Sequence, residues 1–134
     1  MISMDLTNQV AMVTGAGGGI GQALSLDLAG LGADMVLTCR TSRTQCEELA
    51  REIEGMGRRV CILQGDISSS QDCARMAEEA QAFYGGPVGI LVNNAGYFYD
   101  VSPLIRMSDE QINHTIDVNL NCLLYTSPSP RDTR

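Results

Sequence analysis

A glycine-rich segment near the N-terminus constrains the fold more than any other part of this chain. Residues 14–21 read Thr-Gly-Ala-Gly-Gly-Gly-Ile-Gly, after an apolar run at 9–13 and before apolar residues at helical spacing. Glycine lets the backbone turn tightly and lets a ligand approach its N–H groups, which would lie at the positive end of a helix dipole. The sequence therefore predicts a strand–turn–helix unit that receives a phosphate-bearing ligand.

The rest of the chain alternates between strand-like and helix-like hydrophobic periods. Short apolar runs at 9–13, 35–38, 60–63 and 90–92 are typical of buried strands. The buried faces of the intervening helices are predicted to be Ile20, Leu24, Leu28 and Leu31, then Cys46, Leu49, Ile53 and Met56, then Cys73, Met76, Ala80 and Phe83. This alternation predicts an α/β fold: the incomplete N-terminal half of a Rossmann-type doubly wound parallel sheet, with strand order 3-2-1-4.

The spacing of the glycines narrows the interpretation. The common dinucleotide pattern GxGxxG would need a glycine at position 20, which is Ile20. The segment instead fits TGxxxGIG, and in this it resembles the classical short-chain dehydrogenase/reductase family. Further matches over residues 7–121 are Asp66 after the third strand, Asn93-Asn94-Ala95-Gly96 after the fourth, and Asn119 in a later helix.

The resemblance implies a role for each of these residues. In the family, the Asp that matches Asp66 receives the adenine amino group, and the next backbone N–H, here that of Ile67, meets a ring nitrogen. Asn119 matches the helix asparagine of the catalytic tetrad. The residues expected to bind the cofactor are Thr14, Gly15, Gly17, Gly18, Gly19, Ile20, Gly21, Arg40, Asp66, Ile67, Asn93, Asn94, Ala95 and Gly96.

The end of the second strand predicts the cofactor. An acidic residue there would accept the adenosine ribose hydroxyls and repel a 2′-phosphate, which selects NAD. This chain has Cys39 followed by Arg40, with Arg43 close by. Guanidinium groups suit a phosphate dianion, so we expect NADP(H). The alternative is that Arg40 is only a surface charge.

The family's proton-transfer pair is missing from this chain. The family uses a Tyr with a Lys four residues later, and a Ser that orients the substrate carbonyl. All nine basic residues here are Arg, so no such pair exists and the chain itself is predicted to be inactive. The parent protein is expected to transfer a hydride between NADP(H) and a small carbonyl or alcohol substrate. It most resembles 3-oxoacyl-carrier-protein reductases and related ketone reductases. A non-catalytic dinucleotide-binding module is the alternative.

The sequence pattern changes over the last residues of the chain. Ser108 and Gln111 have the spacing of a capping box, which predicts a helix. Pro128 and Pro130 would interrupt its continuation. Residues 122–132 also read as a translated sequencing adapter of the transposase type. We therefore expect a cofactor-binding domain at 1–121 and a non-native tail at 122–134, against the alternative of a natural Pro/Ser-rich tail.

Composition excludes several other classes. A net charge of −7 without a basic block argues against nucleic-acid binding. No apolar run is long enough for a membrane span, and no signal peptide is recognisable, so a cytoplasmic protein is expected. The five cysteines lack metal-ligand spacing and are expected to be buried thiols, and no metal site is expected. The family resemblance implies a homotetramer or homodimer.

Overall fold

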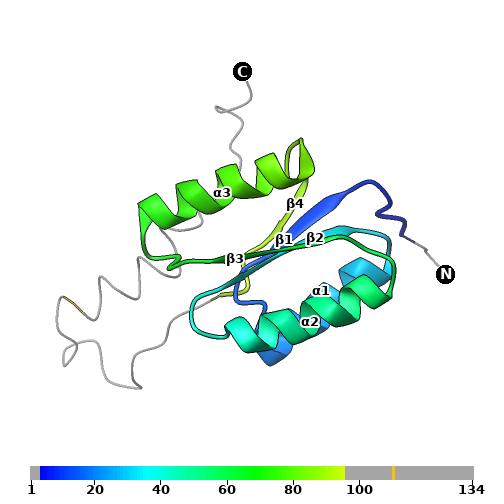
Figure 1. Ribbon diagram of the computed structural model, residues 1–134, viewed down its shortest axis with the longest axis horizontal. Coiled ribbons are helices and arrows are strands. Elements are labelled where there is room, and N and C mark those ends of the chain that lie inside the picture. Colours follow the sequence, from blue (N-terminus) through cyan, green and yellow to red (C-terminus); the bar gives the residue numbers. More distant parts are fainter. Residues whose placement is uncertain (1–3, 96–109, 111–134) are drawn as a thin grey trace.

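A parallel sheet between two helical layers organises the part of the chain that the structure describes (Figure 1). The structure is a computed structural model, and it describes residues 4–95 and residue 110. The elements in chain order are β1 (Val10–Val13), α1 (Gly19–Gly30), β2 (Asp34–Cys39), α2 (Arg43–Gly55), β3 (Val60–Gln64), α3 (Ser70–Tyr84) and β4 (Ile90–Val92). Apart from Glu110, which is helical, the predicted helix near Ser108 and the predicted tail lie outside the described residues.

The strand order β3-β2-β1-β4 confirms the expected topology. All three strand pairs are parallel, with Ala11 paired to Met35 on one side and to Ile90 on the other. Helices α1 and α2 cover one face of the sheet, and α3 covers the opposite face (Figure 1). The chain leaves β1 toward β2 in one direction and reaches β4 on its other side. The carboxyl ends of the central strands therefore border a crevice, where doubly wound folds bind ligands.

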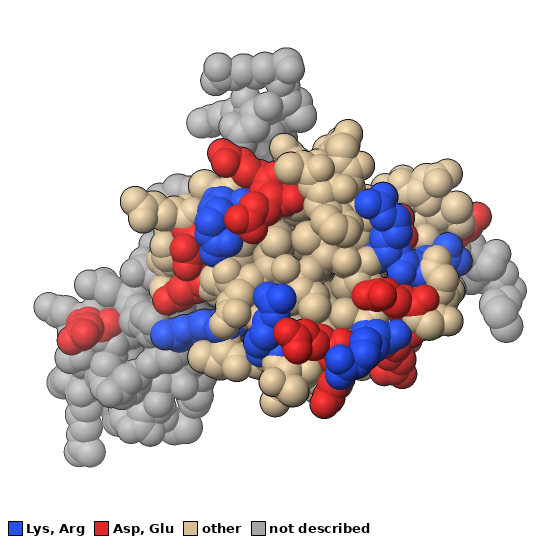
Figure 2. All heavy atoms as spheres, viewed as in Figure 1, with Lys and Arg blue, Asp and Glu red and all other residues tan. Residues whose placement is uncertain are grey.

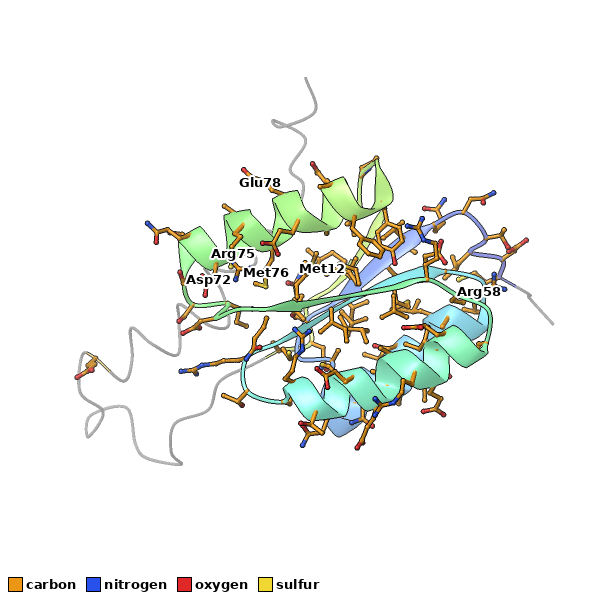
Figure 3. The ribbon with its side chains drawn as sticks, in the orientation of Figure 1. Met12, Arg58, Asp72, Arg75, Met76 and Glu78 are labelled. Atoms are coloured by element: carbon orange, nitrogen blue, oxygen red, sulfur yellow. The ribbon has the colours of Figure 1, made fainter. Side chains whose placement is uncertain are left out.

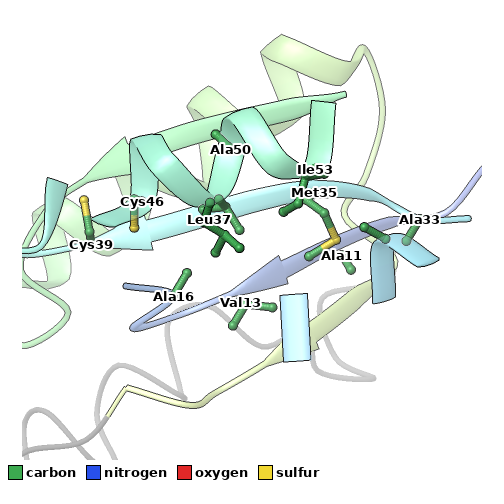
Figure 4. Packing of buried hydrophobic residues seen from close by; sticks show 12 residues of the cluster. Ala11, Val13, Ala16, Ala33, Met35, Leu37, Cys39, Cys46, Ala50 and Ile53 are labelled. Atoms are coloured by element: carbon green, nitrogen blue, oxygen red, sulfur yellow. The ribbon is translucent and has the colours of Figure 1, made fainter. Parts of the chain in front are cut away.

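Two apolar cores fill the spaces between the sheet and its helices. Successive residues of a strand point to opposite faces, so Ala11 and Val13 face α1 and α2 whereas Met12 faces α3. Figure 4 shows the larger core, where Met35 and Leu37 of β2 meet Ile53 of α2. Burial on both faces explains why β1 and β2 are nearly continuous apolar runs.

The predicted buried face of α1 is wrong at Ile20 and Leu31, whereas Leu24 is half-buried and Leu28 packs, partly buried, against the core. The helix buries its small residues Gly21, Ser25 and Ala29, whereas Ile20 is 71% exposed and Leu31 is 37% exposed. Small residues four apart let the helix axis approach the sheet closely. The Ser25 hydroxyl can be buried because it donates to the Gly21 carbonyl at 2.7 Å. The periodicity argument failed because it assumed that the largest apolar side chains of a helix face the core.

The predicted faces of α2 and α3 are confirmed except at their last positions. Cys46 and Ile53 are fully buried in α2, as is Cys73 in α3. Met56, the C-cap of α2, is 41% exposed, and Phe83 is 46% exposed. Met56 follows the last residue of α2, and Phe83 precedes Tyr84, which packs against the core and donates its hydroxyl to the Met35 carbonyl at 2.7 Å, so Tyr84 and not Phe83 faces the sheet at the end of α3. The cysteines at positions 39, 46, 61 and 73 are buried free thiols, as expected.

Candidate cofactor-binding site

A cavity of about 290 Å³ lies at the carboxyl-terminal edge of the sheet. Its walls are formed by the last two residues of β2 and by the segments that follow each of the four strands. The lining residues are Gly15, Gly18, Thr38, Cys39, Arg40, Thr41, Ser42, Gly65, Asp66, Ile67, Asn94 and Ala95. Loops at this edge vary without disturbing the sheet, and α/β folds place their ligand sites here.

Three glycines of the β1–α1 turn are required for packing. Gly15 has a left-handed backbone (φ 65°), and an added Cβ would lie 2.9 Å from the Ala95 Cα. At Gly17 an added Cβ would overlap the side chain of Ser42, with 2.6 Å to its Cβ. At Gly21 an added Cβ would collide with the Gly15 carbonyl and lie 2.9 Å from the Ala16 Cα. Any side chain at these positions would move the turn.

Gly18 and Gly19 have a different environment. An added Cβ at Gly18 would lie 3.7 Å from the Gly15 carbonyl, and at Gly19 it would meet no atom within 4 Å. Gly18 is the N-cap of α1, and no side chain accepts from the first-turn N–H groups. An uncapped helix N-terminus beside open space is suited to an anion, because its N–H groups and dipole both favour negative charge.

Thr14 and Asn94 join this turn to the loop after β4. The Thr14 hydroxyl accepts the backbone N–H groups of Asn94 at 3.1 Å and of Ala95 at 3.0 Å. The Asn94 amide donates to the Gly15 carbonyl at 3.2 Å. Thr14 is itself 3% exposed, so its hydroxyl serves the protein rather than a ligand. These bonds hold the two loops that flank the crevice at the central strands.

The other side of the cavity carries opposite charges. Arg40 follows β2, and its Nε lies 3.9 Å from Oδ2 of Asp66, which follows β3. The Asp66 Oδ1 accepts the N–H and the hydroxyl of Ser68, at 2.9 and 2.7 Å. Arg40 is 58% exposed, so the ion pair contributes little stability, about 0–1 kcal/mol.

Arg43 pairs with a carboxylate of its own helix. Its Nε lies 3.0 Å from the Glu47 carboxylate one turn along α2, and Arg43 is not among the cavity-lining residues. Basic and acidic side chains alternate over the face shown in Figure 2, in keeping with such local pairs. Arg40 is therefore the guanidinium that the described residues place at the cavity.

The structure separates the predicted cofactor-binding residues into groups. Those that line the cavity are Gly15, Gly18, Arg40, Asp66, Ile67, Asn94 and Ala95. Those buried behind it are Thr14, Gly17 and Gly21, whereas Gly19, Ile20 and Asn93 are exposed and do not line it. Gly96 and the predicted catalytic residue Asn119 lie outside the described residues.

Sequence reasoning did not predict several lining residues. These are Thr38, Thr41, Ser42 and Gly65, whereas Cys39 was considered only as the neutral residue at the position that selects the cofactor. The signal that could have found them is positional, because every segment after a parallel strand reaches the same edge of the sheet. Among residues 4–95, no helix is long and apolar enough to cross a membrane. The described residues also contain no group of three or more His, Cys, Asp or Glu side chains that could hold a metal ion.

Comparison with known proteins identifies the family. Residues 9–129 match the sequence profile described as short chain dehydrogenase. This chain belongs to the short-chain dehydrogenase family. Its relatives in that family include the 3-oxoacyl-[acyl-carrier-protein] reductase of Pseudomonas aeruginosa, 40% identical over 124 residues that cover 92% of this chain and 49% of the relative. The chain spans about half the length of the curated short-chain dehydrogenases that it matches.

Solved structures of the family share this fold. A blue fluorescent protein from a metagenomic library, in complex with NADPH, matches with a TM-score of 0.86 and 33% identity, over 92% of this chain and 50% of that chain. A short chain dehydrogenase from Burkholderia cenocepacia, in complex with NADP, matches with a TM-score of 0.85 and 31% identity, over 91% and 49% of the two chains. The described sheet therefore has the architecture of the N-terminal half of these short-chain dehydrogenases.

Proposed function

We propose that this chain is the NADP(H)-binding part of an oxidoreductase that interconverts a carbonyl compound and an alcohol. The observation that carries the proposal is the cavity, where an open glycine turn, an uncapped helix N-terminus and one guanidinium meet. These groups fit the two phosphate positions of NADP. Membership of the short-chain dehydrogenase family, with solved neighbours in complex with NADPH and NADP, supports the same assignment.

In this proposal each wall of the cavity holds one part of the cofactor. The open turn at Gly18 and Gly19 receives the pyrophosphate, because these positions leave room that packing does not require. Asp66 and Ile67 receive the adenine, and Arg40 receives the 2′-phosphate. The bound nicotinamide would supply or accept the hydride. Thr14 and Asn94 keep the two central loops in place around it.

The preference for NADP(H) over NAD(H) rests on two neighbouring residues. Cys39 at the end of β2 is neutral and 3% exposed, so no carboxylate stands where the ribose hydroxyls would bind. Arg40 is exposed and pairs with a single partly exposed carboxylate at 3.9 Å. Such a weak pair can be exchanged for the stronger contact that a guanidinium makes with a phosphate dianion.

The proposal places the proton-transfer pair and the Ser of the site outside residues 1–121. The chain has no Lys, so the Tyr–Lys pair and the Ser would belong to the remainder of the parent protein, with Asn119 as their partner. Residues 122–134 are then a non-native tail, and the chain alone has no reductase activity. The relative named as a 3-oxoacyl-[acyl-carrier-protein] reductase supports a 3-oxoacyl thioester or another ketone as the substrate class. We propose a homotetramer or homodimer as the assembly of the parent.

Two experiments test this function. Sequencing the source DNA beyond codon 121 should reveal a Ser and a Tyr-x-x-x-Lys motif. Their absence would favour a non-catalytic dinucleotide-binding module. NADPH and NADH are then titrated against the full-length protein, its Arg40→Ala variant and Arg43→Ala as a matched control. NADPH should bind more tightly than NADH, and Arg40→Ala should weaken NADPH alone by about 1–3 kcal/mol. Equal affinities, or a larger effect of Arg43→Ala, would contradict the preference.

A further inference from the structure

The loop that carries Asp66 is attached to the start of α3. The backbone N–H of Asp66 donates to Oδ2 of Asp72 at 2.8 Å. The Asp66 carbonyl accepts the N–H of Ser69 at 2.9 Å. Asp72 lies in the first turn of α3, which Figure 3 shows beside the end of β3. The backbone on both sides of Asp66 is therefore held by one helix N-terminus.

The role of Asp72 differs from that of an ordinary capping residue. Ser69 is the N-cap of α3 and accepts the Asp72 N–H at 3.2 Å, which is half of a capping box. In a complete box the third helical residue would return to the N-cap N–H. Here the Ser69 N–H is taken by the Asp66 carbonyl, and the Asp72 carboxylate reaches three residues further back along the chain. The Asp72 carboxylate therefore holds the preceding loop, in addition to lying in the first turn of α3.

Arg75 holds the preceding residues from the same helix. Its Nη2 donates to the Gln64 carbonyl at 2.7 Å and lies 3.7 Å from Oδ1 of Asp72. Gly65 makes room for this guanidinium, since an added Cβ would lie 2.9 Å from the same Nη2. Figure 3 shows Asp72 and Arg75 at the same end of α3, over the end of β3. Neither side chain lines the cavity.

We propose that Asp72 is a positioning residue for cofactor recognition, which fixes the backbone of Asp66 so that its carboxylate faces the adenine side of the cavity. The inference rests on the proposed function, because it assigns the adenine to Asp66. Asp72 acts only through Asp66, and its oxygen is the acceptor that keeps the Asp66 peptide in this orientation. Without that acceptor the peptide can rotate toward water, and the Asp66 side chain turns with it.

The test uses the full-length protein with three variants. Asp72→Ala removes the acceptor, whereas Asp72→Asn keeps an oxygen that can accept the Asp66 N–H. Ser69→Ala is the matched control, because it removes the helix cap but leaves the contact between Asp72 and Asp66. Dissociation constants are measured for NADPH and for reduced nicotinamide mononucleotide, which lacks the adenosine half. The midpoint of thermal unfolding is recorded for each variant.

Asp72→Ala should weaken NADPH binding about tenfold, the usual effect of losing one charge-assisted hydrogen bond. It should leave the mononucleotide within about twofold of wild type, since that probe does not reach Asp66. Asp72→Asn should recover most of the NADPH affinity although it also loses the charge near the helix N-terminus. Ser69→Ala should lower the unfolding midpoint and keep wild-type affinity.

Several results would overturn the inference. Unchanged NADPH binding by Asp72→Ala, no recovery in Asp72→Asn, or an equal loss for the mononucleotide would each contradict a positioning role. If Asp72→Ala does not fold, Asp72→Ser, whose side chain is too short to reach Asp66, carries the same expectation. A wild-type protein that binds no dinucleotide would refute the proposed function and this inference with it. A wild type that binds, with an unaffected Asp72→Ala, would refute the inference alone.

Discussion

Gly19 and Gly21 are separated by a single residue, yet their substitution should have opposite consequences. An added Cβ at Gly19 meets no atom within 4 Å, whereas at Gly21 it would lie 2.9 Å from both the Ala16 Cα and the Asn94 amide nitrogen. Gly19→Val should therefore fold normally and lose cofactor binding, because its side chain would occupy the open space at the turn. Gly21→Ala should destabilise the protein itself.

The magnitudes follow from these environments. Val and Gly differ by about 0.5 kcal/mol in helix propensity, so Gly19→Val should change the free energy of unfolding by less than about 1 kcal/mol. Blocking two charge-assisted contacts to the pyrophosphate should weaken binding by about 3 kcal/mol. For Gly21→Ala, overpacking costs about 1–3 kcal/mol. The lost bond from Asn94 to Gly15 adds about 1 kcal/mol, which the better helix propensity of Ala offsets.

The assay combines urea unfolding, followed by circular dichroism, with fluorescence titration of NADPH. Gly55→Ala is a suitable control, because it replaces a helical glycine whose added Cβ also meets no atom within 4 Å and which is remote from the cavity in sequence. A Gly19→Val protein that binds NADPH as wild type would show that the phosphate does not lie at this turn. A Gly21→Ala protein of unchanged stability would refute the packing argument for that glycine.

Two further predictions concern buried groups near the site. Thr14→Val leaves the N–H of Ala95 without its acceptor and the N–H of Asn94 with only the Val92 carbonyl at 3.0 Å, so the free energy of unfolding in urea should fall by about 1–3 kcal/mol, and an unchanged value would contradict the bracing role. Burial raises the pKa of the Cys46 thiol to about 12 from its ordinary 9.0. Between these values only the unfolded state loses this proton, so stability should fall as the pH rises from 9 toward 12. Comparison of urea midpoints at both ends of that range checks this, since Cys46→Ala should show a smaller decline; an equal decline in both proteins would refute it.

Alternating periods and right-handed crossover connections predict a parallel sheet but allow more than one strand order, and the order 3-2-1-4 was predictable only from the Rossmann-type pattern. Strand β4 matched its predicted range, since a short apolar run between turn residues has few alternatives. The buried face of α1 was not predictable from spacing, because Ser25 is buried through a hydrogen bond that only the folded helix reveals. Periodicity shows which residues of a helix are apolar, but it does not show how closely the helix approaches the sheet.

The candidate site likewise contains features that the sequence predicts and features that it does not. The glycine turn and Asp66 were predictable, because their residue types are demanded by local geometry and by the resemblance to a family. The contact from Asp72 to Asp66 was not predictable, since the pattern around Ser69 indicates only a helix cap. The pairing of Arg43 with Glu47 also depends on side-chain directions along α2. The sequence thus predicts the positions of site residues where backbone geometry determines them. It does not predict which of several neighbouring side chains will form a pair.

The close approach of Gly17 to Ser42 has a consequence for the evolution of cofactor preference. The loop after β2 carries the residues that would distinguish NADP from NAD, and it rests directly on the turn that would hold the pyrophosphate. When cofactor preference changes by substitution of residues 40–42, the size of the side chain at position 42 is therefore limited. A bulkier side chain there would displace this turn and should weaken the binding of both cofactors together. During evolution the charge at position 40 can change without affecting this contact. The side chain at position 42 can become larger only if the backbone at Gly17 moves with it.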